Sequence, residues 1–245
     1  MGKYKEDKNL ELLQYASQDM LAVLVGYLTT DKDGSTRYFE SLTGNDEFKK
    51  ASGDYQRVWK IIASELQHFG GDTIVNMFRG TGVEYKEILT DVCKKLSVKI
   101  DYSAEAIEIE QALLAKLFTD SWEKMSEQEQ AQIYKTLNID GNLKGSAALA
   151  DIIGSIRLGG FTSYQVTIIV ANAIANALLG RGLAFAANAG LARMVGMFAG
   201  PVGIAITALL TLPAFSGPAF RVTLPAVVQV AAIRQQLLKH DRNFF

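Results

Sequence analysis

The chain has 245 residues, a formal net charge of −1 and hydrophobic residues at 49% of its positions. This length is enough for one large domain or two smaller ones, either of which would bury a sizeable core. The single cysteine excludes an intrachain disulfide framework, and the scattered basic residues form no patch for nucleic acid.

The first 137 residues have the pattern of amphipathic helices, because their apolar side chains recur every three or four positions. No proline precedes Pro201, so this part contains no obligatory helix breaker. Ser17 is a predicted N-cap between two short helices, and Ser126 with Glu129 forms a predicted capping box. The best strand candidate is the segment 98–102. The expected helices cover residues 10–28, 58–69, 72–79, 84–97, 104–122 and 127–137.

A polar loop at 138–145, with the sequence NIDGNLKG, separates this part from an apolar one. Its two glycines, two asparagines and aspartate favour a turn, and the composition changes directly after it. We therefore predict a soluble amphipathic helical region at 1–145 and an apolar, acid-poor helical region at 146–245.

The second region is rich in Ala and Gly and nearly free of acidic groups. Residues 147–245 hold 7 basic and 2 acidic side chains, a net charge of +5, whereas residues 1–146 hold 18 and 24, a net charge of −6. No Asp or Glu lies between Ile152 and His240. The apolar pattern predicts helices over residues 146–158, 162–180, 182–198, 202–212 and 224–240.

Two uncharged runs in this region, 158–180 and 194–220, are longer than the roughly 20 residues that a transmembrane helix needs. Polar side chains such as Asn172 interrupt the first run, and three prolines divide the second. Each run can therefore be a core helix of a soluble bundle or part of a hairpin that inserts into a bilayer.

Small residues of the second region recur at helical spacing, which allows helix backbones to approach closely. Arg221 is the only charged residue between Arg193 and Arg234, and a proline lies on each side of it. We expect this arginine to lie at an interface or to pair with a carboxylate of the acidic region. The candidates for helix packing or membrane contact are Gly196, Gly200, Gly203, Pro218, Arg221 and Pro225.

The densest polar cluster is the run ELQHFGGDTIVNMFR, which begins at Glu65. Glu65 and His68 have the spacing of one half of a di-iron site, but the only other histidine is His240 in the tail. The recurrence of polar residues every three or four positions predicts instead a structural stripe that locks two helices around a double glycine. The members of this stripe are Glu65, His68, Asp72, Asn76 and Arg79.

Outside this stripe the sequence has no arrangement typical of an active site. Cys93 lies in an apolar helical pattern and is predicted to be a core residue. Glu105, Glu108 and Glu110 are predicted to lie on a solvated helix face. The fragment that starts at Asp31 lacks the glutamate of a calcium loop, and no serine lies in a Gly-x-Ser-x-Gly elbow. We therefore predict a protein that is not an enzyme and has no catalytic residues, cofactor or metal.

Two long motifs resemble a known family. ELQHFGGDTIVNMFRGTGVEYKEILTDVCKKL at 65–96 and GPAFRVTLPAVVQVAAIR at 217–234 resemble the YaaW-like family of uncharacterised bacterial proteins. The opening, from NLELLQYASQDM onward, is similar to a short N-terminal domain of unknown function that often begins these proteins. Some members of this family carry a label that relates them to a ubiquinol-cytochrome c chaperone. The resemblance therefore implies kinship but no mechanism.

We expect an all-α, multi-helix bundle with an acidic amphipathic N-terminal half and an apolar, Gly/Ala-rich C-terminal helical half. Its layout resembles that of colicin-type and Bcl-2-type proteins, which fold around a hydrophobic hairpin before inserting it into a membrane. The leading hypothesis is therefore membrane association through the C-terminal apolar helices, with pore formation or membrane perturbation as the action. The alternative is a soluble chaperone-like or protein-interaction module whose apolar half is a core or an oligomer interface.

The expected partners follow from these two hypotheses. They are membrane lipids, a second copy of the chain in a homo-oligomer, or an unidentified protein, with no nucleic acid. The N-terminus has no apolar segment of a signal peptide. We therefore expect a cytoplasmic protein that is peripheral to the inner membrane or inserts into it.

Overall fold

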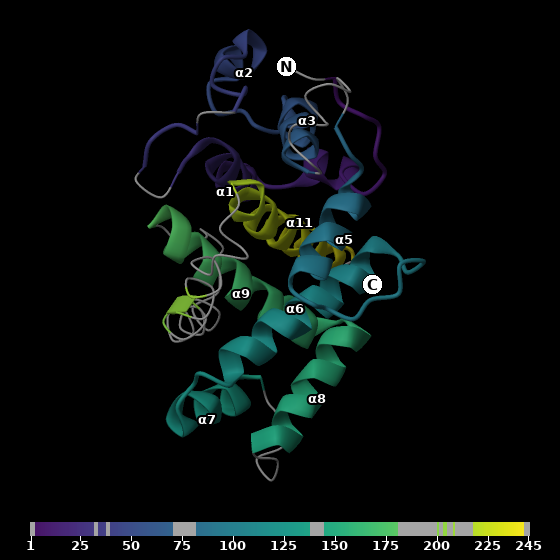
Figure 1. Cartoon of the computed structure of the whole chain (residues 1–245), viewed down its shortest axis with the longest axis vertical. Helices are drawn as coiled ribbons and strands as arrows, with labels where there is room; N and C mark the ends of the chain where they lie inside the picture. The colour runs from purple at the N-terminus through teal and green to yellow at the C-terminus, as the bar shows by residue number, and fades with distance from the viewer. Residues whose placement is uncertain are drawn as a thin grey trace.

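The computed structural model describes residues 3–31, 34–37, 40–70, 82–137, 145–180 and 218–242, together with positions 200, 203, 204 and 208. Within these ranges the chain forms nine α-helices and one 3₁₀ helix, and the β pairing found there is an isolated antiparallel bridge between Thr30 and Thr36. The predicted all-α fold class is therefore confirmed (Figure 1). The strand candidate at 98–102 is an irregular loop.

The helices agree with the periodicity of the sequence in most places. Ser17 accepts a hydrogen bond from the backbone N of Met20, and Ser126 and Glu129 form the predicted capping box. The short α2 was not predicted, and it begins after Asn45, whose side chain caps it. The elements are η1 (Glu11–Tyr15), α1 (Gln18–Thr29), α2 (Asp46–Ala51), α3 (Trp59–Phe69), α5 (Tyr85–Lys95), α6 (Ala106–Trp122), α7 (Glu127–Thr136), α8 (Gly145–Leu158), α9 (Phe161–Leu179) and α11 (Pro218–Arg242).

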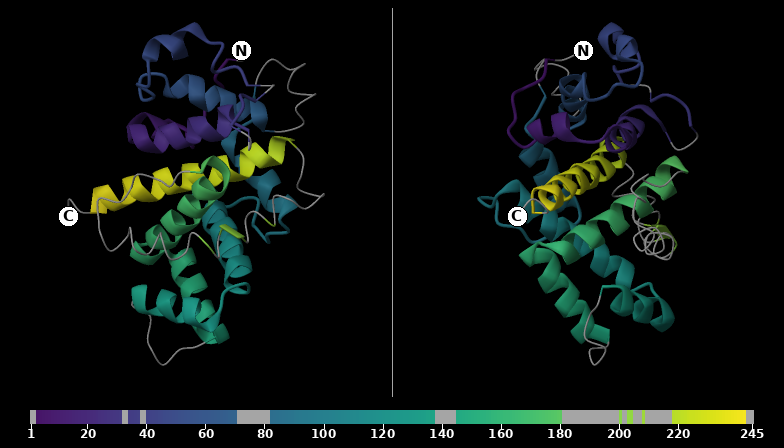
Figure 2. Two further views of the ribbon diagram at one scale, coloured as in Figure 1. Left: turned by 90° about the vertical axis from the view of Figure 1, so that its left-hand side faces the viewer. Right: turned by 180° about the vertical axis from the view of Figure 1, so that it is seen from behind.

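The last helix, α11, lies at the centre of the molecule. It packs most extensively on α9 and also contacts η1, α1, α3, α5 and α6. In both views of Figure 2 it crosses the middle of the fold, between α1 and α9. Every residue from Val222 to Ile233 is buried, as expected of a helix that is apolar on all sides. The apolar C-terminal helix is therefore wrapped by elements of the acidic region.

α11 begins six residues before the predicted helix 224–240. Pro218 suits the first turn of a helix, where a backbone N–H has no partner within the helix. Pro225 lies inside the helix and has no N–H to donate to the carbonyl of Arg221, yet the helix continues through it. Packing of α11 on every side explains why Pro225 does not end it.

The described core residues form one hydrophobic cluster that extends from Leu10 to Ile233, so the two predicted regions share a core. The predicted boundary between residues 145 and 146 lies at the start of α8, and it stays a prediction, since residues 138–144 before it lie outside the described ranges. α9 is the one described helix with the length and composition to cross a membrane, and 72% of that stretch is buried within the fold.

Close packing occurs at two glycines, Gly70 of the predicted double glycine and Gly82, which the sequence did not single out. A Cβ on Gly70 would clash with the side chain of Ile88, and a Cβ on Gly82 would lie 2.5 Å from the Cβ of Gln67 and 2.6 Å from its backbone carbon. A Cβ on Gly200 would meet nothing within 4 Å. Among the described glycines the tightest packing is thus between α3 and the start of α5.

Candidate functional site

A buried ion pair connects α6 to α11. Arg234 Nε lies 2.9 Å from Glu110 Oε2 and 3.2 Å from Oε1, with 18% and 2% of the two side chains exposed. The Tyr85 hydroxyl donates to Glu110 Oε1 at 2.7 Å, and Arg234 Nη2 donates to the carbonyl oxygen of Asn9 at 3.1 Å. The pair therefore holds α5, α6, α11 and the N-terminal segment together.

The electrostatics of this cluster fix its protonation. Burial is the largest single effect and lowers the pKa of Arg234, but attraction to Glu110, its hydrogen bonds and the nearby Tyr85 and Asp7 together raise that pKa overall. Burial also raises the pKa of Tyr85 well above its ordinary value, and the negative charge of Glu110 adds to this effect. Burial also raises the pKa of Glu110, while Arg234 and Tyr85 lower it. Arg234 is thus a cation, and Tyr85 is a neutral hydrogen-bond donor to Glu110.

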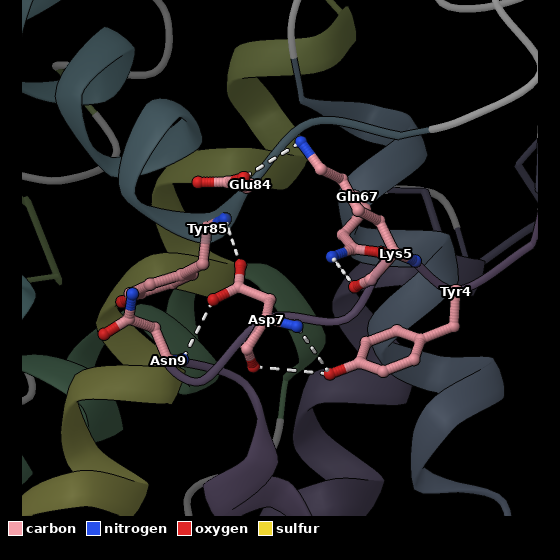
Figure 3. Close-up of polar contacts among 7 residues, drawn as sticks. All are labelled: Tyr4, Lys5, Asp7, Asn9, Gln67, Glu84 and Tyr85. Atoms are coloured by element: carbon pink, nitrogen blue, oxygen red, sulfur yellow. Dashed lines mark hydrogen bonds and ion pairs between the residues drawn. The ribbon is translucent and has the colours of Figure 1, made fainter.

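The N-terminal segment docks beside the same tyrosine through Asp7, which is 6% exposed (Figure 3). Asp7 Oδ2 accepts a hydrogen bond from the backbone N of Tyr85 at 2.6 Å, and its Oδ1 accepts from the backbone N of Asn9 at 2.9 Å. Glu84, the N-cap residue of α5, makes no capping hydrogen bond with its own side chain. Asp7 therefore supplies the cap of α5 from a distant part of the chain.

Further contacts hold the same segment against α3. Gln67 is fully buried, and its amide pairs with the backbone of Lys5 in both directions, at 3.0 Å and 2.8 Å. Lys5 Nζ also lies 3.0 Å from Glu84 Oε1. These contacts join the N-terminal segment, α3 and α5 (Figure 3).

The residues that follow the ion pair in sequence, Gln111 and Gln235, line a cavity of about 340 Å³. The turn between α8 and α9 forms its opposite wall. The ion pair links α6 to α11, and both helices contribute residues to this cavity. A volume of this size is within the range of about 300–1,000 Å³ that is typical of binding pockets.

Two large apolar side chains stand at the mouth of the cavity. Leu158 is 89% exposed and Phe161 is 61% exposed. Between them Gly159 and Gly160 have φ angles of 77° and 85°, a conformation that favours glycine. This sharp turn ends α8, starts α9 and presents both side chains outward, so we call Leu158, Phe161 and the cavity beneath them the corner pocket.

A cation and an aromatic ring complete the corner pocket. Lys239 Nζ lies 4.5 Å from the ring centroid of Tyr164 and 5.8 Å from that of Phe161. Tyr164 is buried, and burial raises its pKa, so its ring is a neutral partner for the ammonium group. The lining holds no nucleophile with an adjacent base; its apolar groups, amides and cation are suited to binding.

The two described members of the predicted polar stripe form separate contacts. Glu65 is 3% exposed, and its carboxylate accepts hydrogen bonds from the backbone N and hydroxyl of Ser41 at 2.8 Å and 2.5 Å. His68 Nδ1 lies 2.5 Å from the carbonyl oxygen of Ser64. Among the described residues no group of three His, Cys, Asp or Glu side chains is placed to hold a metal. The members that lie outside the described residues are Asp72, Asn76 and Arg79.

The packing candidates are spread over several places. Gly196 lies outside the described residues, and Gly203 would place a Cβ 3.9 Å from the Ala173 carbonyl oxygen, an ordinary contact. Arg221 lines a second cavity and has no hydrogen-bond partner for its Nε among the described residues. Arg221 was expected to lie at an interface or to pair with a carboxylate of the acidic region; it lies beside residues of α1 and α9, and the ion pair between the two regions is made by Arg234.

The prediction for Glu110 was wrong, since this residue is 1% exposed. Glu105 and Glu108 do lie at the exposed start of α6. The signal that could have found the buried carboxylate is its spacing, because Leu113, Leu114 and Leu117 follow at three, four and seven residues on the same helix face. Cys93 is buried, as predicted.

Comparisons with known proteins agree with the resemblance noted in the sequence. A family model described as ubiquinol-cytochrome C chaperone matches residues 54–227, and one described as a domain of unknown function (DUF3944) matches residues 4–38. The chain is 41% identical over 233 residues to a UPF0174 protein of Helicobacter pylori strain J99, covering 94% of this chain and 92% of that protein. It is 36% identical over 242 residues to the UPF0174 protein YaaW of Escherichia coli K12, covering 96% of each. No solved structure matches the chain.

Proposed function

This chain belongs to the UPF0174 family of YaaW proteins and, over residues 54–227, to the family described as ubiquinol-cytochrome C chaperone, and on that premise we propose a non-enzymatic, chaperone-like function. The protein binds an apolar segment of another polypeptide in the corner pocket. The observation that carries this proposal is the exposure of Leu158 and Phe161 at the mouth of a cavity of about 340 Å³.

The exposed pair distinguishes this place from the rest of the described surface. Single exposed apolar residues are common, but two large ones on either side of a double-glycine turn over a pocket form a contact site for another chain. Covering a side chain of this size contributes about 1.5–3 kcal/mol. Phe161 and Leu158 are therefore the residues on which affinity should depend most.

The rest of the lining specifies the kind of segment that fits. The amide groups of Gln111 and Gln235 can donate to and accept from a peptide backbone, which is what an extended segment offers. Lys239 at the rim favours an acidic group next to the apolar residues. The ligand is thus an apolar stretch of polypeptide that carries a carboxylate near one end.

Pore formation has less support. α9 is the one described helix able to cross a membrane by length and composition, and most of it is buried against α11 and other helices. Inserting it would break these contacts and expose buried polar side chains such as Thr167 and Asn172 to lipid. An exposed site for polypeptide needs no such rearrangement.

The test is suppression of aggregation. Light scattering of a heat-denatured reporter enzyme such as citrate synthase is measured with the wild-type protein and with Phe161→Ser. Tyr102→Ser is a matched control, because Tyr102 is an aromatic residue with the same exposure of 61% and lies away from the pocket. We expect the wild type and the Tyr102 variant to suppress scattering and the Phe161 variant to lose most of this activity. Equal suppression by all three proteins would refute the proposed site.

A further inference from the structure

A second cavity of about 340 Å³ lies on a different part of the fold from the corner pocket. Its walls are the end of α1 with the loop after it, the last turn of α9 and the first turn of α11. Two arginines from distant parts of the sequence, Arg37 and Arg221, line it together with Asp31. The cavity therefore has two fixed positive charges and one negative charge.

Arg37 is already held in place. Its Nη1 lies 2.5 Å from Asp31 Oδ1, its Nε donates to the Tyr27 carbonyl oxygen at 3.1 Å, and 13% of its side chain is exposed. Burial lowers the pKa of Arg37, Asp31 raises it, and the positive charge of Arg221 lowers it. Arg221 is thus near enough to repel the first guanidinium.

Arg221 is only partly satisfied. Its Nε is buried and has no hydrogen-bond partner among the described residues. It also lies in the first turn of α11, where the helix dipole adds positive potential. The two guanidinium groups repel each other, and one of them has an N–H donor, unpaired among the described residues, next to a cavity. An oxyanion bound in the cavity would stabilise this arrangement.

We propose that this cavity binds the phosphate group of a small molecule between Arg37 and Arg221. Two guanidinium groups offer several donors to a tetrahedral oxyanion, and the hydroxyl of Thr30 lies in the same lining. Leu178 and Leu179 provide an apolar wall for the remainder of the molecule. With Asp31 already paired to Arg37, the site retains one uncompensated positive charge for the ligand.

The first test is binding of inorganic phosphate to the full wild-type chain, measured by isothermal titration calorimetry at constant ionic strength. We expect saturable binding of one phosphate per chain. Acetate at the same concentration should displace little of the bound phosphate. Vesicles containing phosphatidylglycerol should bind no more of the protein than vesicles of neutral lipid do. Absence of phosphate binding, stronger binding of acetate, or preference for the anionic vesicles would each overturn the proposal.

Variants locate the site. Arg221→Met should weaken phosphate binding by about tenfold or more, as expected for loss of a charged hydrogen bond. Arg157→Gln is the control, because Arg157 is exposed on α8 and lies outside this cavity. Phe161→Ser should keep full phosphate binding, which separates this site from the corner pocket. Equal affinities in the Arg221 and Arg157 variants would place the phosphate elsewhere and refute the assignment.

Discussion

Replacing Arg234 by Met should destabilise the fold strongly and in a pH-dependent manner. Met is apolar and of similar length, so the change removes the cation and its hydrogen bonds while keeping much of the packing. Glu110 would then remain buried with the Tyr85 hydroxyl as its hydrogen-bond donor. Removing one partner of a buried ion pair costs about 3–5 kcal/mol of unfolding free energy.

Protonation of Glu110 limits this loss. Taking up a proton near pH 7, against the ordinary glutamate pKa of 4.5, costs about 3 kcal/mol at about 1.4 kcal/mol per pH unit. Burial already raises the pKa of Glu110 in the wild type, although Arg234 and Tyr85 oppose it, and without Arg234 this folded-state pKa rises further above the unfolded value. The folded state then binds the extra proton, so stability is present below the unfolded pKa and is lost as pH rises through the folded pKa. The variant should lose about 3 kcal/mol near pH 7 and about 1 kcal/mol near pH 5.

Urea denaturation followed by circular dichroism measures both values. The double variant Glu110→Gln with Arg234→Met should regain most of the lost stability, since no charge is left buried and Gln still accepts from Tyr85. Lys94→Met is the surface control, because Lys94 and Asp91 form an ion pair with about half of each side chain exposed and should contribute under about 1 kcal/mol. If Arg234→Met loses no more than the Lys94 variant at either pH, the ion pair does not hold α6 to α11.

Three further predictions concern other buried groups. Burial raises the pKa of Glu65 above its ordinary value of 4.5. The stability of the wild type relative to Glu65→Gln should therefore be highest below pH 4.5 and should fall as pH rises through the folded-state pKa. Urea midpoints of the two proteins across this pH range measure the difference. Gly82→Ala should lower the free energy of unfolding by about 1–3 kcal/mol, because its Cβ would press on the backbone of Gln67. Gly200→Ala should change it by less than about 0.5 kcal/mol, and equal thermal melts of the two variants would contradict the packing found at Gly82. Burial raises the pKa of Cys93 to about 12, so its thiol should stay unreactive toward Ellman's reagent in the native protein and react fully in urea.

Local signals in the sequence predicted the helices well, because a cap or an amphipathic stripe is decided within a few residues. Ser17 and Ser126 cap their helices through neighbours three positions away, as the sequence indicates. The cap of α5 comes from Asp7, 78 residues earlier in the chain, and no local pattern reveals such a partner. A single sequence does not reveal which distant residue forms the hydrogen bonds of a buried polar group.

The candidate site was hidden for a similar reason. Leu158 ends the predicted helix 146–158 and Phe161 directly precedes the predicted helix 162–180, and only the geometry of the turn between them makes both side chains exposed. Pro225 was placed in the first turn of the predicted helix 224–240, yet α11 begins at Pro218 and continues through Pro225, because packing on every side overrides the local preference. Counting charges did identify the acid-poor C-terminal region, and this region provides the helix around which the other elements pack.

The most direct test of the corner pocket is a binding curve. A fluorescein-labelled extended peptide of apolar residues with one terminal carboxylate is titrated with the wild-type protein, Phe161→Ser and Tyr102→Ser, and the anisotropy is recorded. We expect saturable binding to the wild type and the Tyr102 variant, with affinity for the Phe161 variant lower by about tenfold or more. Equal affinities for the three proteins, or the absence of saturable binding to the wild type, would contradict a polypeptide-binding function for this pocket.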